Sequence, residues 1–156
     1  MFLLIILILS STLIIGQNCG KFHKNPDCRV KNSNGFKPFG QSRSTVVDAG
    51  KTYKYQVILF GGYDYKIGLC TEKDYTPIHI KILNVEDSTV IYDNSEDEYT
   101  ETVGLANENT KNVLLEITVM ASEMEFRDVG DSRTCLGINM MWRKIPLMVL
   151  KKKDDE

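Results

Sequence analysis

Alternating apolar residues are concentrated between positions 51 and 94 of this 156-residue chain. Four short runs there place every second residue in one hydrophobic set, and glycines or charged residues separate the runs. A period of two is that of a β-strand with one buried face. The predicted inward sets are Tyr53, Tyr55, Val57 and Leu59; Tyr65, Ile67 and Leu69; Ile78, Ile80 and Ile82; and Val90 with Tyr92.

The same pattern continues toward the C-terminus, where it predicts two further buried faces. Val113, Leu115, Ile117 and Val119 form one inward set, and Leu136, Ile138, Met140 and Trp142 form the other. No segment shows a period of 3.6 with capping residues, so helices are not expected. The expected strands span residues 43–48, 51–60, 64–71, 76–85, 89–94, 98–105, 111–122 and 134–144.

Short, regularly spaced strands predict an all-β fold, an antiparallel β-sandwich of jelly-roll or Greek-key type with about eight strands. Gly61 and Gly62 predict a tight hairpin between the second and third strands, since glycine accepts positive φ. Asn107 to Asn109 and residues 123–132 are expected to form a turn and a loop.

The N-terminal segment, residues 1–16, is uncharged and almost wholly apolar. It is too short and too interrupted to span a bilayer comfortably, so we expect a signal peptide cleaved near Gly16. A retained anchor is the alternative, because no basic residue precedes the apolar run; lipidation at Cys19 is a weaker one. We expect an irregular cysteine-containing arm at 17–41, the sandwich domain at 42–144 and a charged tail at 145–156.

Four cysteines, Cys19, Cys28, Cys70 and Cys135, follow the export segment, and this even number predicts two disulfides. Cys70 and Cys135 are out of phase with inward Leu69 and Leu136, so both are expected on the outer face of their strands. If these strands are neighbours, the two sulfurs meet across the pair, which leaves Cys19 to bond Cys28. His23 between Cys19 and Cys28 offers too few ligands for a convincing metal site.

The order of these strands resembles a recurring pattern. It comprises Y-x-V-x-L-x2-G-x-D-Y-x-I-x-L-C from Tyr55, I-x-I-x-I at 78–82, V-I-Y-D-N at 90–94 and L-L-E-I-T-V at 114–119. The pattern is similar to a family of small exported β-sandwich proteins of Gram-negative bacteria with no assigned function, and more loosely to the bacterial pre-peptidase C-terminal domain. The resemblance implies export and a sandwich fold, and it transfers no catalytic residue.

An acidic turn is the best candidate metal site. Asp93, Ser95 and Asp97 alternate like calcium ligands, but Glu98 stands where an EF-hand loop needs glycine, which favours a solvated turn without metal. Whether the turn binds calcium is left open by the sequence. The acidic and amide residues of this turn are Asp93, Asn94, Glu96, Asp97, Glu98 and Glu101.

Catalytic signals are weak. His79 is expected to point outward, and the sequence has no G-x-S-x-G or H-E-x-x-H motif. Tyr63 and Tyr75 flank turns and are candidates for ligand contacts, whereas the alternation places Tyr65 and Trp142 in the core.

The net charge of −2 gives no basic surface for nucleic acid. We therefore expect an exported, non-enzymatic binding module, periplasmic or extracellular, without cofactor or metal, whose partner is a protein or a carbohydrate. A sandwich that binds envelope or extracellular polysaccharide is the alternative, and a small hydrolase ranks last.

Overall fold

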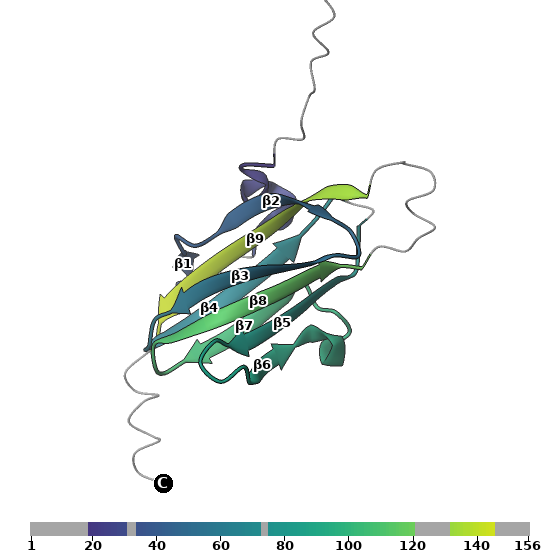
Figure 1. Ribbon diagram of the computed structural model, residues 1–156. Coiled ribbons are helices and arrows are strands. Elements are labelled where there is room, and N and C mark those ends of the chain that lie inside the picture. The colour runs from purple at the N-terminus through teal and green to yellow at the C-terminus, as the bar shows by residue number, and fades with distance from the viewer. Residues whose placement is uncertain (1–18, 31–33, 73–74, 121–131, 146–156) are drawn as a thin grey trace, which may run out of the picture.

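The computed structural model describes residues 19–30, 34–72, 75–120 and 132–145, and these form an antiparallel β-sandwich (Figure 1). The all-β prediction is confirmed: within the described ranges, the helical segments are short 3-10 turns. Five strands form one sheet, here called sheet A, and four form the second, sheet B. The predicted signal segment, most of the 123–132 loop and all of the predicted tail except Ile145 lie outside the described residues.

Sheet A is centred on the longest strand, β9, which pairs with β4 on one side and with both β1 and β2 on the other. Sheet B has the order β3-β8-β5-β6. The strands of sheet A are β1 (Lys37–Pro38), β2 (Arg43–Asp48), β4 (Tyr63–Cys70), β7 (Thr102–Asn107) and β9 (Arg133–Lys144). Those of sheet B are β3 (Thr52–Leu59), β5 (Ile78–Asn84), β6 (Val90–Asp93) and β8 (Lys111–Val119).

The core lies between the two sheets and contains most of the predicted inward residues. Ile67, Ile80 and Leu115 are fully buried, and the Tyr65 hydroxyl accepts the Phe60 N–H at 2.7 Å. The exception is Val90, predicted inward but 55% exposed. The β5–β6 register shifts at this point, so Val90 pairs with Leu83 while Tyr92 still faces the core. A β-bulge thus reverses the expected orientation of Val90.

The strand predicted over 98–105 begins later, at Thr102. The 3-10 helix η4 (Asn94–Asp97) precedes it, and Glu98 and Tyr99 have φ values of 50° and 56°, which no strand residue adopts. Asn107, expected in a turn, ends β7 and is buried. Its amide donates to the Leu59 and Phe60 carbonyls at 3.0 Å each, so it links β7 to the end of β3.

The hairpin predicted at Gly61–Gly62 is wrong, because β3 and β4 belong to different sheets. The chain crosses from sheet B to sheet A at these glycines, next to the β7–β8 turn. A Cβ on Gly61 would lie 2.6 Å from the Glu108 carbonyl oxygen, and Gly62 has φ +79°. The glycines are required by close packing and positive φ, and the same local signal serves a crossing between sheets as well as a hairpin.

The predicted disulfide pairing is also wrong. Cys19 bonds Cys135 and Cys28 bonds Cys70, with Cα–Cα distances of 5.4 and 5.2 Å. The predicted neighbours β4 and β9 do pair, but Cys70 stands opposite Gly137, so Cys135 is its diagonal neighbour. Diagonal Cα atoms are about 7–8 Å apart, beyond the usual disulfide range of about 4.4–6.8 Å. Both strand cysteines therefore bond the arm.

Candidate functional site

The first described part of the predicted arm, residues 19–30 and from here on called the arm, lies against the outer face of sheet A, where Figure 1 shows its helical turns beside β2 and β9. Its two 3-10 turns are η2 (Phe22–Lys24) and η3 (Pro26–Cys28). Asn25 separates them and caps η3, accepting the Asp27 N–H through its side chain. Pro26 begins η3 at a position where its missing N–H costs no hydrogen bond.

Two glycines of sheet A make room for the arm. A Cβ on Gly137 would lie 2.5 Å from Cys70 Sγ, 3.1 Å from His23 Cα and 3.2 Å from Cys28 Sγ. A Cβ on Gly68 would overlap the Val30 side chain. The arm backbone therefore approaches the sheet at positions where the strands carry no side chain.

His23 fixes the middle of the arm to sheet A. Its carbonyl accepts the Asn139 amide at 3.0 Å, and its N–H donates to Ser44 Oγ at 2.7 Å. The same hydroxyl lies 2.6 Å from His23 Nδ1. Burial, and then the neighbouring Lys24, lower the pKa of His23, which favours a neutral ring that accepts the Ser44 proton. This pair holds the arm, and no described carboxylate orients the imidazole as a catalytic triad requires.

A groove of about 670 Å³ opens between the arm and residues 38–42. Its apolar surface includes Val30, Phe39 and Met141, and its polar surface includes Lys24 and Arg29, with no acidic residue in the lining. This volume falls in the range of small-molecule sites. The complete lining is His23, Lys24, Arg29, Val30, Pro38, Phe39, Gly40, Ser42, Asn139 and Met141.

The wall of the groove opposite the arm is held by Phe39 and Ser42. Ser42 Oγ accepts the Met140 N–H at 2.9 Å and donates to the Phe39 carbonyl at 2.9 Å. The Phe39 ring packs on Trp142 and Tyr65, with centroids 5.0 and 5.4 Å away. Ser42 is thereby committed to backbone contacts, while Lys24 and Arg29 are exposed and form no ion pair among the described residues. The groove presents cationic donors beside a preformed apolar wall.

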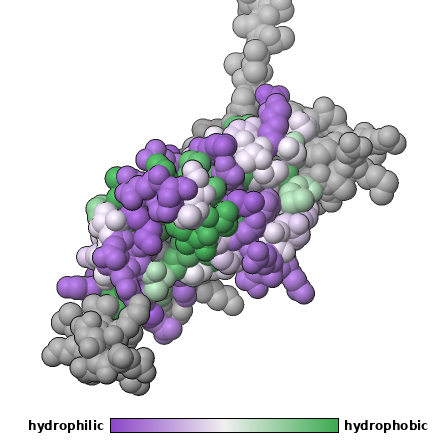
Figure 2. Space-filling view, turned by 60° about the horizontal axis from the view of Figure 1, so that its bottom comes forward, coloured by the Kyte–Doolittle hydropathy of each residue, from purple (hydrophilic) through white to green (hydrophobic). Residues whose placement is uncertain are grey.

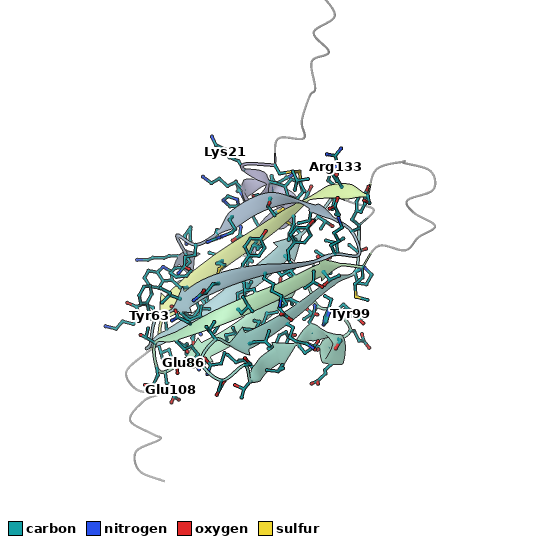
Figure 3. The ribbon with its side chains drawn as sticks, viewed as in Figure 1. Lys21, Tyr63, Glu86, Tyr99, Glu108 and Arg133 are labelled. Carbon is teal, nitrogen blue, oxygen red and sulfur yellow. A yellow bond between two sulfur atoms is a disulfide. The ribbon has the colours of Figure 1, made fainter. Side chains whose placement is uncertain are left out.

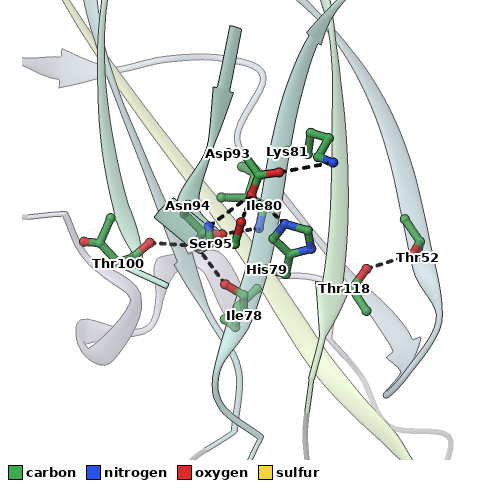
Figure 4. A network of polar contacts seen from close by, with 10 residues as sticks. All are labelled: Thr52, Ile78, His79, Ile80, Lys81, Asp93, Asn94, Ser95, Thr100 and Thr118. Carbon is green, nitrogen blue, oxygen red and sulfur yellow. Dashed lines mark hydrogen bonds and ion pairs between the residues drawn. The ribbon is translucent and has the colours of Figure 1, made fainter. Parts of the chain in front are cut away.

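His79, predicted to point outward, lies on the opposite side of the sandwich from the groove, on the outer face of sheet B (Figure 4). Its Nε2 lies 2.8 Å from Asp93 Oδ1, which also accepts the Ser95 hydroxyl at 2.7 Å. Asp93 therefore stands between serine and histidine, whereas a triad needs histidine in the middle. Lys81 contacts the second Asp93 oxygen at 3.1 Å.

Hydrogen bonding accounts for the charge state of Asp93. The Ser95 hydroxyl, followed by His79, the Ser95 N–H and Lys81, holds the pKa of Asp93 well below its usual range, against the opposing effect of burial. The carboxylate caps η4 through the Ser95 N–H at 3.0 Å. Both of its oxygens are used within the protein, so it is a structural group.

The rest of the acidic turn is held by Asn94, which is fully buried. Its side chain accepts the Ile80 N–H at 2.8 Å and donates to the Ile78 and Thr100 carbonyls at 2.9 and 3.0 Å. Asn94 thus continues the hydrogen bonding of β5 beyond the end of β6. In the part of the chain that the structure describes, no three acidic, histidine or cysteine side chains are grouped to hold a metal ion.

Tyr63 and Tyr75, the two tyrosines predicted as candidate ligand contacts, lie in different environments. Tyr75 is buried in the core, which removes it as a candidate. Tyr63 is half-buried and stacks on Trp142, with centroids 4.5 Å apart and planes 21° apart. Phe60, 43% exposed, lies 6.2 Å from Trp142 and extends this aromatic cluster to the surface.

Sequence reasoning missed the groove because its residues come from the arm, from the segment before β2 and from β9. The visible signals were the basic residues of the arm and a glycine at an outward position of each of two strands. Neither signal identifies a site until the arm is placed over the sheet.

Comparisons with known proteins give little further information. No protein-family model and no curated protein matches this sequence. Among solved structures, the chain is similar to PliG of Aeromonas hydrophila, a periplasmic lysozyme inhibitor of g-type lysozyme, at 9% identity. The match covers 65% of this chain and 84% of that one, with a TM-score of 0.46. Among the described residues, no helix has the length and hydrophobicity needed to cross a membrane.

Proposed function

We propose that this chain is an exported, non-enzymatic binding module and that the groove under its arm takes a small amphiphilic anion. The observation that carries the proposal is the lining of the groove: an apolar wall next to two exposed cationic side chains, with no acidic residue. Such a site favours a ligand with a hydrocarbon part and a carboxylate, sulfate or phosphate group.

The covalent construction of the groove supports a binding role. The arm is short and its turns are too small to be stable alone, yet two disulfides and the His23 contacts fix it on sheet A. A fixed arm reduces the entropy lost on binding, so a preformed groove gains affinity. The two disulfides also support an oxidising compartment, the periplasm or the exterior.

The polar groups near the groove favour binding over catalysis. Ser42 is committed to the backbone, and Ser44 and His23 are committed to each other. Lys24 and Arg29 remain able to contact a ligand, and both are cations whose N–H groups donate hydrogen bonds to anions.

The test is calorimetric titration with octyl sulfate and with octylammonium, which share the hydrocarbon chain and differ in charge. Both are used below their micelle-forming concentrations. We expect octyl sulfate to bind and octylammonium not to bind. Lys24→Gln and Arg29→Gln should each weaken octyl sulfate binding several-fold, since a charged hydrogen bond contributes roughly 1.5–3 kcal/mol before solvent screening reduces it.

Lys111→Gln is the matched control, because Lys111 begins β8 in sheet B. It should leave octyl sulfate binding unchanged. Equal binding of the two probes, or an equal loss in the control and the groove variants, would contradict the proposed site.

A polysaccharide remains the second candidate ligand, and the aromatic cluster of Phe60, Tyr63 and Trp142 favours it. Aromatic faces stack on sugar rings, and Phe60 exposes part of its ring at the end of β3. Phe60→Ala should then abolish binding of an oligosaccharide without affecting octyl sulfate. Oligosaccharide binding that is unchanged in Phe60→Ala would rule out this cluster.

A further inference from the structure

A second surface, independent of the groove, lies on the outer face of sheet B. Leu83 pairs with Leu114 across β5 and β8, and Val90 stands opposite Leu83 on the other side. Because of the bulge at this position, Ile91 is also exposed, at 38%. We call Leu83, Val85, Val90, Ile91 and Leu114 the β6 patch. Figure 2 brings the β6 side of the molecule forward and shows a continuous apolar area there, bordered by hydrophilic residues.

The exposure of this patch is not explained by core packing. Val90 is 55% exposed and Val85 is 42% exposed. Surface apolar residues are common singly, but a contiguous group spanning three strands marks an interaction site more often than chance placement does. Farther along the same face, Lys81 and Asp93 pair at 3.1 Å and Lys54 and Glu116 pair at 2.7 Å. The patch therefore has a polar boundary on that side.

The chain segment that carries Val85, Val90 and Ile91 is acidic. From residue 84 to residue 110 the sequence contains eight acidic residues and no lysine or arginine. The remaining residues carry all 19 Lys and Arg and the other 13 of the 21 acidic residues, so the rest of the chain is net positive. Glu86 follows Val85 directly, and Figure 3 places Glu86 and Glu108 at the same end of the molecule.

This distribution decides between possible occupants. A symmetric contact between two copies would bring the two acidic segments together, and like charges across an interface are unfavourable. An anionic membrane surface would be repelled for the same reason. A partner that presents apolar side chains flanked by lysine or arginine satisfies both the patch and its surroundings.

We infer that the β6 patch docks a cationic, amphipathic segment of another protein. The apolar side chains of that segment would cover Val90 and Leu83, and its basic side chains would face the acidic residues of 84–110. Electrostatic attraction would raise the association rate and make binding weaker at high salt. This surface is on the opposite sheet from the groove, so the inference does not depend on the proposed small ligand.

The experiment uses two fluorescein-labelled twelve-residue peptides of alternating sequence, one of valine and lysine and one of valine and glutamate. Fluorescence anisotropy should show binding of the lysine peptide and none of the glutamate peptide. Val90→Ser should weaken binding of the lysine peptide about tenfold, because an apolar contact of this size contributes on the order of 1.4 kcal/mol. Glu86→Gln should weaken it less and should reduce its salt dependence.

Val46→Ser is the matched control, since Val46 is an exposed valine, at 36%, on β2 of the other sheet. It should leave peptide affinity unchanged. Failure of the lysine peptide to bind, equal binding of the glutamate peptide, or equal effects of Val46→Ser and Val90→Ser would each overturn the inference. Sedimentation that shows a dimer abolished by Val90→Ser would assign the patch to a second copy and would also overturn it.

Discussion

The outer faces of the two sheets are built from different residues although both sheets bury an aliphatic inner face. Sheet A places Gly68, Gly137, Cys70 and Cys135 outward, and the arm covers them. Sheet B places outward the long charged side chains of Lys54, Lys81 and Glu116, and no described segment covers them.

The difference shows that the residue types at the outward positions of a strand indicate whether another segment covers that face. Small residues and cysteines at these positions leave room and bonds for a covering segment, whereas long charged residues keep a face in water. The arm has few buried apolar residues of its own, so covalent bonds replace much of the missing hydrophobic stabilisation. The outer face of sheet A, here called the covered face, therefore depends for its stability on individual disulfides and glycines. The outer face of sheet B, here called the open face, does not.

The largest expected effect is the loss of either disulfide. The bonds span 116 and 42 residues, so both close long loops. The chain-entropy model gives about 5 and about 4 kcal/mol for these closures, before any native strain is subtracted. Replacing either cysteine pair with alanine should lower the denaturant midpoint severely, measured by chemical unfolding. A mild loss for the Cys28–Cys70 pair would show that this part of the arm is not required for the covered face.

A smaller effect is expected from a single methyl group under the arm. Gly137→Ala should destabilise by about 1–3 kcal/mol, because two sulfurs and the His23 backbone cannot move away from the new Cβ. Gly104→Ala, in β7 of the same sheet, is the control, since nothing lies within 4 Å of a Cβ there. Thermal unfolding of the two variants should separate them clearly, and equal melting temperatures would show that the arm does not contact Gly137.

On the open face, breaking an ion pair should have little effect. Lys54 Nζ lies 2.7 Å from Glu116 Oε1, with 62% of the lysine side chain exposed. Exposed pairs contribute about 0–1 kcal/mol to stability. Lys54→Gln should therefore lower the free energy of unfolding by less than Gly137→Ala does. A loss as large as that of Gly137→Ala would remove the distinction between the two faces.

The smallest effect is a difference in acid sensitivity between the faces. The pKa of His23 is lowered on folding, so stability should fall as pH decreases below the unfolded value of about 6.5 and level off below the folded pKa. The pKa of Asp93 is also lowered, and its contribution is present above an unfolded pKa of about 4 and lost at lower pH. Chemical unfolding from pH 7 to pH 3 should show both losses. His23→Gln should remove the loss of stability near pH 6. If the stability of that variant still falls with pH near 6, another group causes the loss.

Periodicity predicted most of the strands because their inner faces are buried, and it failed at Val90, where the bulge interrupts the alternation. The bounds of β2 agree with the prediction, and β8 and β9 begin within one residue of it. The outward positions of Cys70 and Cys135 followed from the same alternation. Their partners did not, because the arm has no period and four cysteines permit three pairings.

The turn at Gly61–Gly62 and the groove mark the limit of local sequence signals. A glycine pair reports tight backbone geometry, but it does not report which sheet receives the next strand. Arg29 and Met141 are 112 positions apart in the sequence and meet only because the disulfides hold the arm on β9 and β4. The site therefore depends on tertiary contacts that the alternation does not encode.

The most direct test of the covered face is non-reducing tryptic mapping of the purified protein. Lys21, Lys24, Arg29, Lys66 and Arg133 separate the four cysteines into four peptides. The structure predicts two linked pairs, one joining Cys19 to the peptide 134–143 and one joining the peptide 25–29 to the peptide 67–73. A Cys19–Cys28 pair together with a Cys70–Cys135 pair would free the arm from sheet A and contradict the groove.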